Sequence, residues 1–123
     1  RPPSRYVFAL PEDISVMEMT LWRPGDHEPP EPLEQLMPDD AASAERVSAA
    51  TPETIRSRGG NARFVRYTLA QKRFDDVEEV AVWRARIQLS SGAVASVSAH
   101  AAESSIDRVD AAFLAFVQGV REE

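Results

Sequence analysis

Alternating hydrophobic and polar side chains predict a β-hairpin in the second half of this chain. One alternation runs over residues 79–89 and another over residues 93–101, separated by Ser90-Ser91-Gly92. Successive side chains of a strand point to opposite faces of a sheet, so each run predicts a half-buried antiparallel strand. Gly92 supplies the positive φ that a short hairpin loop needs.

A helical repeat of apolar residues follows the hairpin. Ser104 offers an N-cap oxygen, and Asp107 three residues later forms a capping-box-like pair with it. The apolar residues at helical spacing are Ile106, Val109, Phe113, Phe116, Val117 and Val120. We expect this helix to pack across one face of the sheet and close the core. A helix that binds a partner has the same pattern, and that alternative stays open.

Three further strands are predicted upstream, over residues 6–10, 14–22 and 61–71. In the last of these, the alternation places one set of side chains toward the core and the other set outward. The inward set is Val65, Tyr67 and Leu69, and the outward set is Arg66 and Thr68. Residues 72–78 are rich in charge and are interpreted as a connector.

The segment 28–60 is predicted to be a proline-broken insertion with short helices. Residues 33–37 allow one helical turn, and residues 39–50 have the alanine content of a helix. Thr51-Pro52-Glu53 is a typical helix start, and Gly59-Gly60 a typical end.

The whole chain, 1–123, is therefore predicted to be a single α+β domain, with residues 1–5 as a flexible lead-in. We expect an antiparallel sheet of about five strands, short helices in the middle segment, and a C-terminal helix packed across one face.

This order of elements resembles the PsbP-like α/β/α sandwich superfamily. The matching stretches are Tyr6-Val7-Phe8-Ala9-Leu10-Pro11-Glu12, Arg66-Tyr67-Thr68-Leu69, the strand from Val82 to Leu89, the turn Ser91-Gly92, and Phe116-Val117-Gln118-Gly119-Val120. The second strand departs from the family because it lacks the usual tryptophan after the opening Leu-Pro. The resemblance implies a binding, assembly or chaperone protein, such as the effector-associated chaperones of type VI secretion. No functional residue is carried over from the family.

Composition narrows the function classes. The net charge of −6 argues against a general nucleic-acid binder. The absence of cysteine excludes disulfides, thiol catalysis and thiolate metal sites. No apolar run approaches the ~20 residues that a membrane-spanning helix needs. The start at Arg1 is interpreted as an excised domain or a processed product, so the bacterial cytoplasm and the cell envelope both remain open as locations.

Two groups of residues have side chains suited to site chemistry but are interpreted as ordinary structure. Asp26-His27-Glu28 has metal-ligand residue types, but adjacent ligands in a proline-rich loop rarely converge, so we predict an exposed turn and no metal or cofactor. Ser98 and His100 lie two residues apart on one strand, about 6–7 Å between α-carbons, without a glycine-rich turn that would present a nucleophile.

A face rich in hydrogen-bond donors is the predicted binding surface. Its predicted binding residues are Arg66, Arg84, Arg86, Gln88, Ser98 and His100, with Thr68 and Ser96 beside them. This face is interpreted as solvated sheet, as a surface covered by the acidic middle segment, or as a site for an acidic partner or small anion. The covering carboxylates would be Glu31, Glu34, Asp39, Asp40 and Glu45.

The leading functional hypothesis is a non-enzymatic binding, assembly or chaperone-like module that recognises a protein partner through a sheet face. One alternative is a small hydrolase or ligand-binding domain centred on His100. Another is an accessory domain of a larger secreted or membrane-anchored protein. The sequence does not identify the partner or the oligomeric state.

Overall fold

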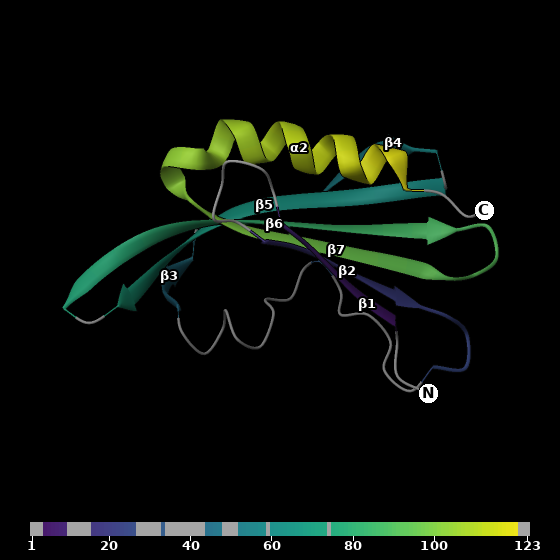
Figure 1. The fold of residues 1–123 in the computed structure, drawn as a ribbon, viewed down its shortest axis with the longest axis horizontal. Helices are drawn as coiled ribbons and strands as arrows, with labels where there is room; N and C mark the ends of the chain where they lie inside the picture. Colours follow the sequence, from purple (N-terminus) through teal and green to yellow (C-terminus); the bar gives the residue numbers. More distant parts are fainter. Residues whose placement is uncertain are drawn as a thin grey trace.

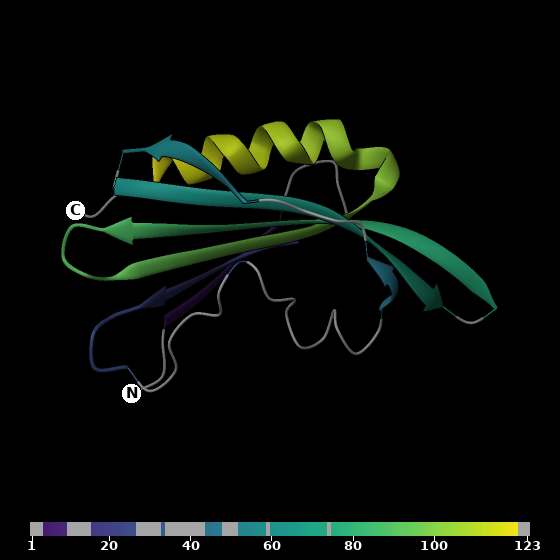
Figure 2. The ribbon, with the colours of Figure 1, turned by 180° about the vertical axis from the view of Figure 1, so that it is seen from behind.

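A computed structural model describes residues 4–9, 16–26, 33, 44–47, 52–58, 60–73 and 75–120. In this part of the chain, seven antiparallel strands form one sheet and helix α2 lies along one of its faces (Figure 1). The strand order is β1-β2-β7-β6-β5-β3, and β4 also pairs with β5. The view from behind shows the same two layers, with α2 on one side of the sheet (Figure 2).

All five predicted strands are present, which confirms the α+β class with an antiparallel sheet and a C-terminal helix. They are β1 (Ser4–Ala9), β2 (Val16–Trp22), β5 (Gly60–Arg73), β6 (Asp76–Leu89) and β7 (Val94–Ala102). Two short strands join them, β3 (Ala44–Val47) and β4 (Glu53–Ser57), and a 3-10 turn, η1 (Glu103–Ser105), precedes α2 (Ile106–Gly119). Since β1 begins at Ser4, the predicted flexible lead-in is wrong for residues 4 and 5, and residues 1–3 lie outside the described residues.

The prediction of short helices in the middle segment is wrong where the structure describes that segment. Residues 53–57 form strand β4 instead of a helix, and residues 44–47 form strand β3. Both pair with the edge of β5 that β6 leaves unoccupied. The half-buried Ile55 explains the difference at β4, because as a strand residue it packs against the core beside α2. A favourable helix start is a weak local preference that such pairing and packing override.

The predicted capping box of α2 is also wrong. The N-cap is Ser105, one residue later than expected, and its side chain makes no capping hydrogen bond. The 3-10 turn η1 displaces the start of the helix. Asp107 still lies in the first turn, where its charge is favourable beside the positive end of the helix dipole.

The main core lies between α2 and the sheet, as the apolar stripe predicts. Val109, Phe113 and Val117 are fully buried from the helix, and Trp83 is fully buried from β6. The rings of Phe64 and Phe113 lie 5.9 Å apart and are tilted by 41°. Beneath them, alanines of β6 and β7 allow the helix to approach closely: Ala81, Ala85, Ala95, Ala99 and Ala101.

The far end of α2 is attached to the turn that follows β4. The Ser57 hydroxyl donates to the Val120 carbonyl at 3.1 Å, and the Arg58 amide donates to the Gln118 carbonyl at 3.0 Å. These bonds satisfy carbonyls that a helix end leaves without an intrahelical partner. The helix is therefore fixed to the sheet both by its apolar stripe and by its C-terminal backbone.

Gly60, at the start of β5, is a position where we expect any side chain to destabilise the fold. Its φ is +150°, and an added Cβ would overlap with the Gln88 carbonyl oxygen. We expect Gly60→Ala to lower the free energy of unfolding by about 2 kcal/mol, the range for an overpacked or strained site. Urea unfolding of this variant and of Gly119→Ala, whose added Cβ meets nothing within 4 Å, provides the measurement. Equal midpoints for both variants would contradict the close approach at Gly60.

Candidate functional site

The pairing register assigns each strand residue to one of two faces. Directly paired residues in neighbouring strands lie on the same face, and alternate residues along a strand also share a face. Trp83 and its register partners lie on the face that α2 covers. Arg84, the next residue along β6, therefore points to the opposite face, which we call the second face.

The middle of the second face is buried in an apolar cluster. The cluster consists of Leu33, Val65, Tyr67, Leu69 and Val82. Leu33 is only 5% exposed and packs against the second face at this point. Of the carboxylates expected to cover the face, Glu31, Glu34, Asp39 and Asp40 lie outside the described residues, and Glu45 belongs to β3 at the sheet edge.

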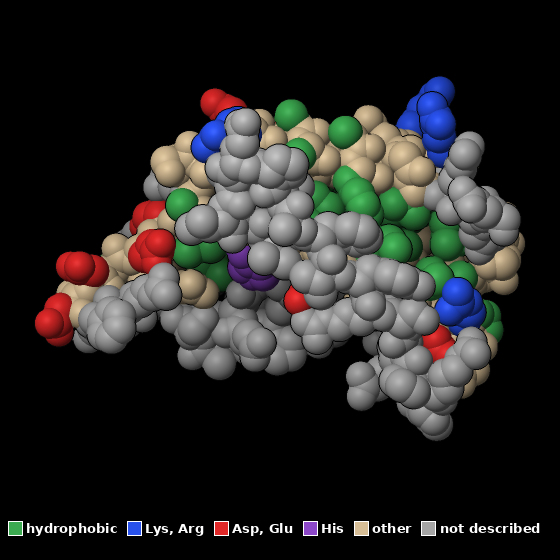
Figure 3. Space-filling model, in the orientation of Figure 1, with side chains coloured by type: hydrophobic (Ala, Val, Ile, Leu, Met, Phe, Trp, Pro, Cys, Tyr) green, Lys and Arg blue, Asp and Glu red, His purple; other side chains and the backbone are tan. Residues whose placement is uncertain are grey.

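The end of the second face beside β4 is exposed and basic. Arg63 pairs directly with Arg86, and Arg56 pairs with Asn61, which pairs in turn with Gln88. We call these five residues the arginine patch. Four of them are exposed and Arg86 is half-buried. The space-filling view shows basic side chains standing out at the end of the molecule where β4 lies (Figure 3).

The residues that continue the two rows of the arginine patch across the described sheet are not acidic. Ser96 and Thr20 extend the row of Arg63 and Arg86, while Val94 and Trp22 extend the row of Gln88, and none of these is acidic. Neither Arg56 nor Arg86 makes a hydrogen bond or ion pair in the described structure, whereas Arg63 does have interactions. Like charges directly opposite each other on a sheet repel, so the pairing of Arg63 with Arg86 favours an anion between them.

Trp22, in the row of Gln88, carries a hydrogen-bond donor that has no acceptor. Its indole nitrogen Nε1 is buried and has no hydrogen-bond partner in the structure. Buried donors are nearly always paired, and an unpaired one costs about 1–3 kcal/mol.

The predicted binding residues fall into separate places. Arg86 and Gln88 belong to the arginine patch. Arg84 is on the second face as predicted, but is only 4% exposed and is not without interactions. Ser98 and His100 are half-buried on the same face, nearer the apolar cluster.

The predicted face is wrong for Arg66, and for Thr68 beside it. Arg66 pairs with Trp83 and Thr68 pairs with Ala81, so both lie on the face of α2. The register explains the error. The β5–β6 hairpin closes with Arg73 paired to Asp76, which aligns the odd positions of β5 with the even positions of β6. The predicted connector at residues 72–78 is mostly strand and sets this register.

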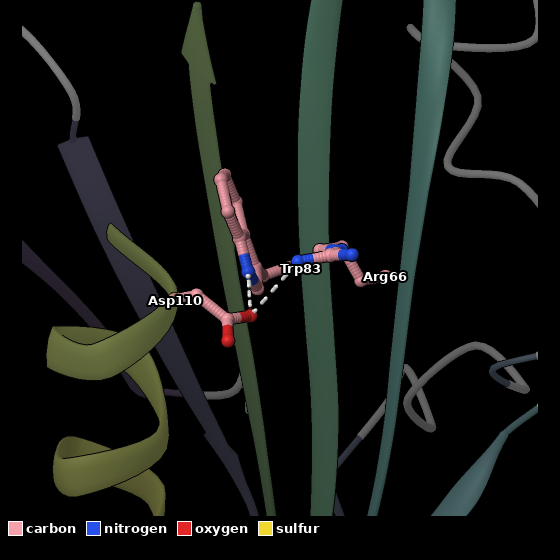
Figure 4. A network of polar contacts seen from close by, with 3 residues as sticks. All are labelled: Arg66, Trp83 and Asp110. Carbon is pink, nitrogen blue, oxygen red and sulfur yellow. Dashed lines mark hydrogen bonds and ion pairs between the residues drawn. The ribbon is translucent and has the colours of Figure 1, made fainter. Parts of the chain in front are cut away.

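On the helix-side face, Arg66 belongs to a small polar network (Figure 4). The indole Nε1 of Trp83 donates a 2.8 Å hydrogen bond to Asp110 Oδ1 on α2. Arg66 forms an ion pair with the same oxygen at 3.5 Å. Trp83 is fully buried, whereas the Arg66 side chain is 44% exposed and that of Asp110 is 32% exposed. Asp110 therefore joins the helix to the sheet chiefly through the tryptophan.

We expect Asp110→Ala to lower the free energy of unfolding by about 2 kcal/mol, because it leaves a buried indole N–H without an acceptor. Asp110→Asn keeps an oxygen acceptor and should cost less. Arg66→Gln removes only an exposed charge, for which the effect is about 0–1 kcal/mol. Chemical denaturation followed by tryptophan fluorescence measures all three. An Arg66 effect as large as that of Asp110→Ala would contradict this division of roles.

For the hydrolase alternative, the structure places a carboxylate near His100, but the serine beside it makes no hydrogen bond within the described residues. Glu18 pairs directly with Ser98, so a carboxylate lies close to the serine and to His100. A serine nucleophile must hydrogen-bond to its histidine. In the described structure Ser98 makes no hydrogen bond, although His100 and Glu18 have interactions. This arrangement does not favour the hydrolase alternative.

The Asp26 region forms a turn, as predicted. The Asp26 carboxylate accepts a 2.8 Å hydrogen bond from the Arg23 amide, and its own amide donates to the Arg23 carbonyl at 3.0 Å. His27 and Glu28 lie outside the described residues. Within the described ranges, no three histidine, aspartate or glutamate side chains lie together as a metal site.

The opposite end of the molecule is acidic. Acidic side chains gather at the tip of the β5–β6 hairpin in the space-filling view (Figure 3). Asp75, Asp76 and Val77 are exposed at this tip, and Glu78 follows them in the chain. Among the described helices, none is long and apolar enough to cross a membrane.

Comparison with known proteins supports the fold and no particular function. No protein-family model matches the chain, and no curated protein matches its sequence. The crystal structure of PA94, a protein of unknown function from Pseudomonas aeruginosa described as a candidate regulator, is similar with a TM-score of 0.65 at 13% identity. The similarity covers 100% of this chain and 85% of that chain. Identity this low shows a shared fold only, and the PsbP-like resemblance stays a prediction.

Proposed function

We propose that this protein is a non-enzymatic binding or assembly module that recognises a protein partner through the exposed end of its second face. One observation carries the proposal. The arginine patch presents three guanidinium groups and two amides on adjacent strands, without a described carboxylate in the same two rows.

Burial of the rest of the sheet supports this choice of surface. The helix-side face is filled by the main core, and the middle of the second face is filled by the apolar cluster. At the end of the second face beside β4, the charged and amide side chains of the arginine patch remain accessible. Charged groups at an interface give specificity and speed of encounter more than raw affinity, which suits reversible recognition.

The test uses the whole chain as bait in native cells, followed by binding measurements with the purified partner that is captured. Arg86→Gln and Gln88→Ala are the variants in the arginine patch. Arg108→Gln is the matched control, because Arg108 is exposed on α2 and its substitution makes the same charge change. We expect the patch variants to weaken binding about tenfold and the control to leave it unchanged.

A hydrogen-exchange comparison of free and bound protein locates the surface directly. We expect bound partner to protect the amides of β4 and the first half of β5. Protection confined to α2, or equal loss of affinity in Arg108→Gln and Arg86→Gln, would overturn the proposal.

A further inference from the structure

We infer that the outer edge of β1 binds the β1 strand of a second copy of this chain, so that two sheets join as one across a two-fold axis. β1 is the last strand of the pairing order and lies at the margin of the sheet opposite β4 (Figure 1, Figure 2). Within the described ranges, no strand pairs with its outer edge. An edge of this kind presents backbone N–H and C=O groups on which a further strand can form.

The opposite margin carries features that block strand addition, and β1 lacks most of them. β3 has four residues, and its register with β5 shifts between Ala44 and Arg46. β4 has five residues, of which Glu53 and Arg56 are exposed charges. Short strands, bulges and charges are common ways in which sheet edges avoid pairing with other chains. β1 has six residues in unbroken register with β2, and its sequence contains neither proline nor lysine. This contrast marks β1 as the margin that accepts a strand.

The sequence of β1 is compatible with antiparallel pairing to itself. Directly paired residues share a face, so a continuous sheet opposes residues of like parity. A two-fold axis at Val7 places Val7 opposite its own copy. Arg5 is then opposite Ala9 of the second copy, and Tyr6 is opposite Phe8 of the second copy. This register gives two aromatic cross-strand pairs and opposes no like charges, which is the combination that stabilises strand pairing.

A second copy also closes the assembly, whereas an added peptide does not. A peptide strand on β1 leaves a new outer edge. Two copies joined through β1 end at β3 and β4 on both sides, where the blocking features lie. A two-fold interface uses the same surface of both copies and forms a closed dimer. The geometry therefore favours a dimer over a filament.

The first test is the mass of the purified chain in solution, measured by sedimentation over a range of concentrations. We expect two chains of 13.6 kDa each, which separate on dilution. Because the chain has no cysteine, a single introduced cysteine can form a disulfide only between copies. Directly opposed α-carbons lie about 4.5–5.5 Å apart, within the range that a disulfide spans. Oxidation with diamide should link Val7→Cys into dimers and leave Ala111→Cys, exposed on α2, unlinked.

Charge substitutions at Ala9 test both the register and the identity of the partner. Ala9→Arg places like charges opposite Arg5 at both ends of the seam, and Ala9→Glu places opposite charges there. We expect the first to weaken the dimer and the second to tighten it, each by about three- to tenfold. The double variant Arg5→Glu, Ala9→Arg should restore wild-type association. The same substitutions at Ala111 provide the control.

Three results would overturn the inference. One is a single-chain mass at every concentration. Another is a dimer in which Val7→Cys forms no disulfide, or in which both Ala9 variants act alike, because the copies then meet elsewhere. The third is a monomer whose β1 amides become protected from hydrogen exchange by the captured partner, because β1 then accepts a foreign strand.

The dimer and the proposed function fail separately. The arginine patch lies on β4, β5 and β6, away from the seam. Arg86→Gln should therefore leave the dimer unchanged, and Ala9→Arg should leave the affinity of each chain for the captured partner unchanged. A monomer that still binds its partner through Arg86 ends this inference and leaves the proposed function standing.

Discussion

Phe113→Ala is expected to lower the free energy of unfolding by about 3–5 kcal/mol, the usual cost of truncating a buried aromatic side chain. Phe113 is fully buried between α2 and the sheet, and its ring lies 5.9 Å from that of Phe64. Truncation removes this ring contact and leaves a cavity that the surrounding strands cannot fill. The loss is a large share of the roughly 5–15 kcal/mol by which a domain of this size is stable. Urea denaturation followed by circular dichroism measures it.

Phe116→Ala is the matched comparison, because Phe116 belongs to the same apolar stripe but is only partly buried. We expect it to cost about 1–2 kcal/mol, since less area leaves water on folding. The sequence pattern alone predicts an equal loss of stability for the two truncations. The different burial of the two rings in the structure predicts unequal losses. If both variants unfold at the wild-type midpoint, α2 does not close the core, and the interpretation of this helix as a partner-binding element gains support.

The strands of the hairpin and the closing helix are predictable because each rests on a strong local pattern. The alternation over residues 79–89 is long and uninterrupted, and Gly92 takes a φ of +91° in the turn that follows. The helix is marked by six apolar residues at one spacing. In each case, local preference and burial point to the same structure.

The middle segment is not predictable in the same way, because its structure depends on contacts with distant residues. β4 has a sequence that starts a helix well, yet it becomes a strand by pairing with β5 and packing Ile55 under α2. β3 is held by residues 69–71, more than twenty positions away along the chain. Pairing over such separations leaves no local signal in the sequence.

The candidate site is predicted only in part, for a reason of register. A shift of one residue moves every side chain of a strand to the other face. The sequence indicates which residues of β5 alternate, but the closing pair of the hairpin decides which face they share with β6. For this reason the sequence pattern predicts the wrong face for Arg66 and does not identify Arg63. The pairing Arg73 with Asp76 is the signal that places Arg63 opposite Arg86.

Arg84→Gln is expected to lower the free energy of unfolding by about 3 kcal/mol, although Arg84 and Arg86 are indistinguishable in the sequence pattern. Arg84 is 4% exposed and has interactions, so the substitution removes a buried charged group from the contacts that it makes. Its direct strand partners are Val65, in the apolar cluster, and Ser98. We expect faster amide hydrogen exchange in β5 and β6 around these residues.

Arg86→Gln makes the same chemical change two residues further along the same face, where the side chain is half-buried and has no described ion pair. Its effect on stability should stay within about 0.5 kcal/mol. Its effect should appear in partner binding, which Arg84→Gln alters only as far as it unfolds the protein. The two variants therefore separate folding from recognition on one strand. If Arg86→Gln destabilises the fold as much as Arg84→Gln does, the exposed end of the second face serves the fold, and the partner must bind elsewhere.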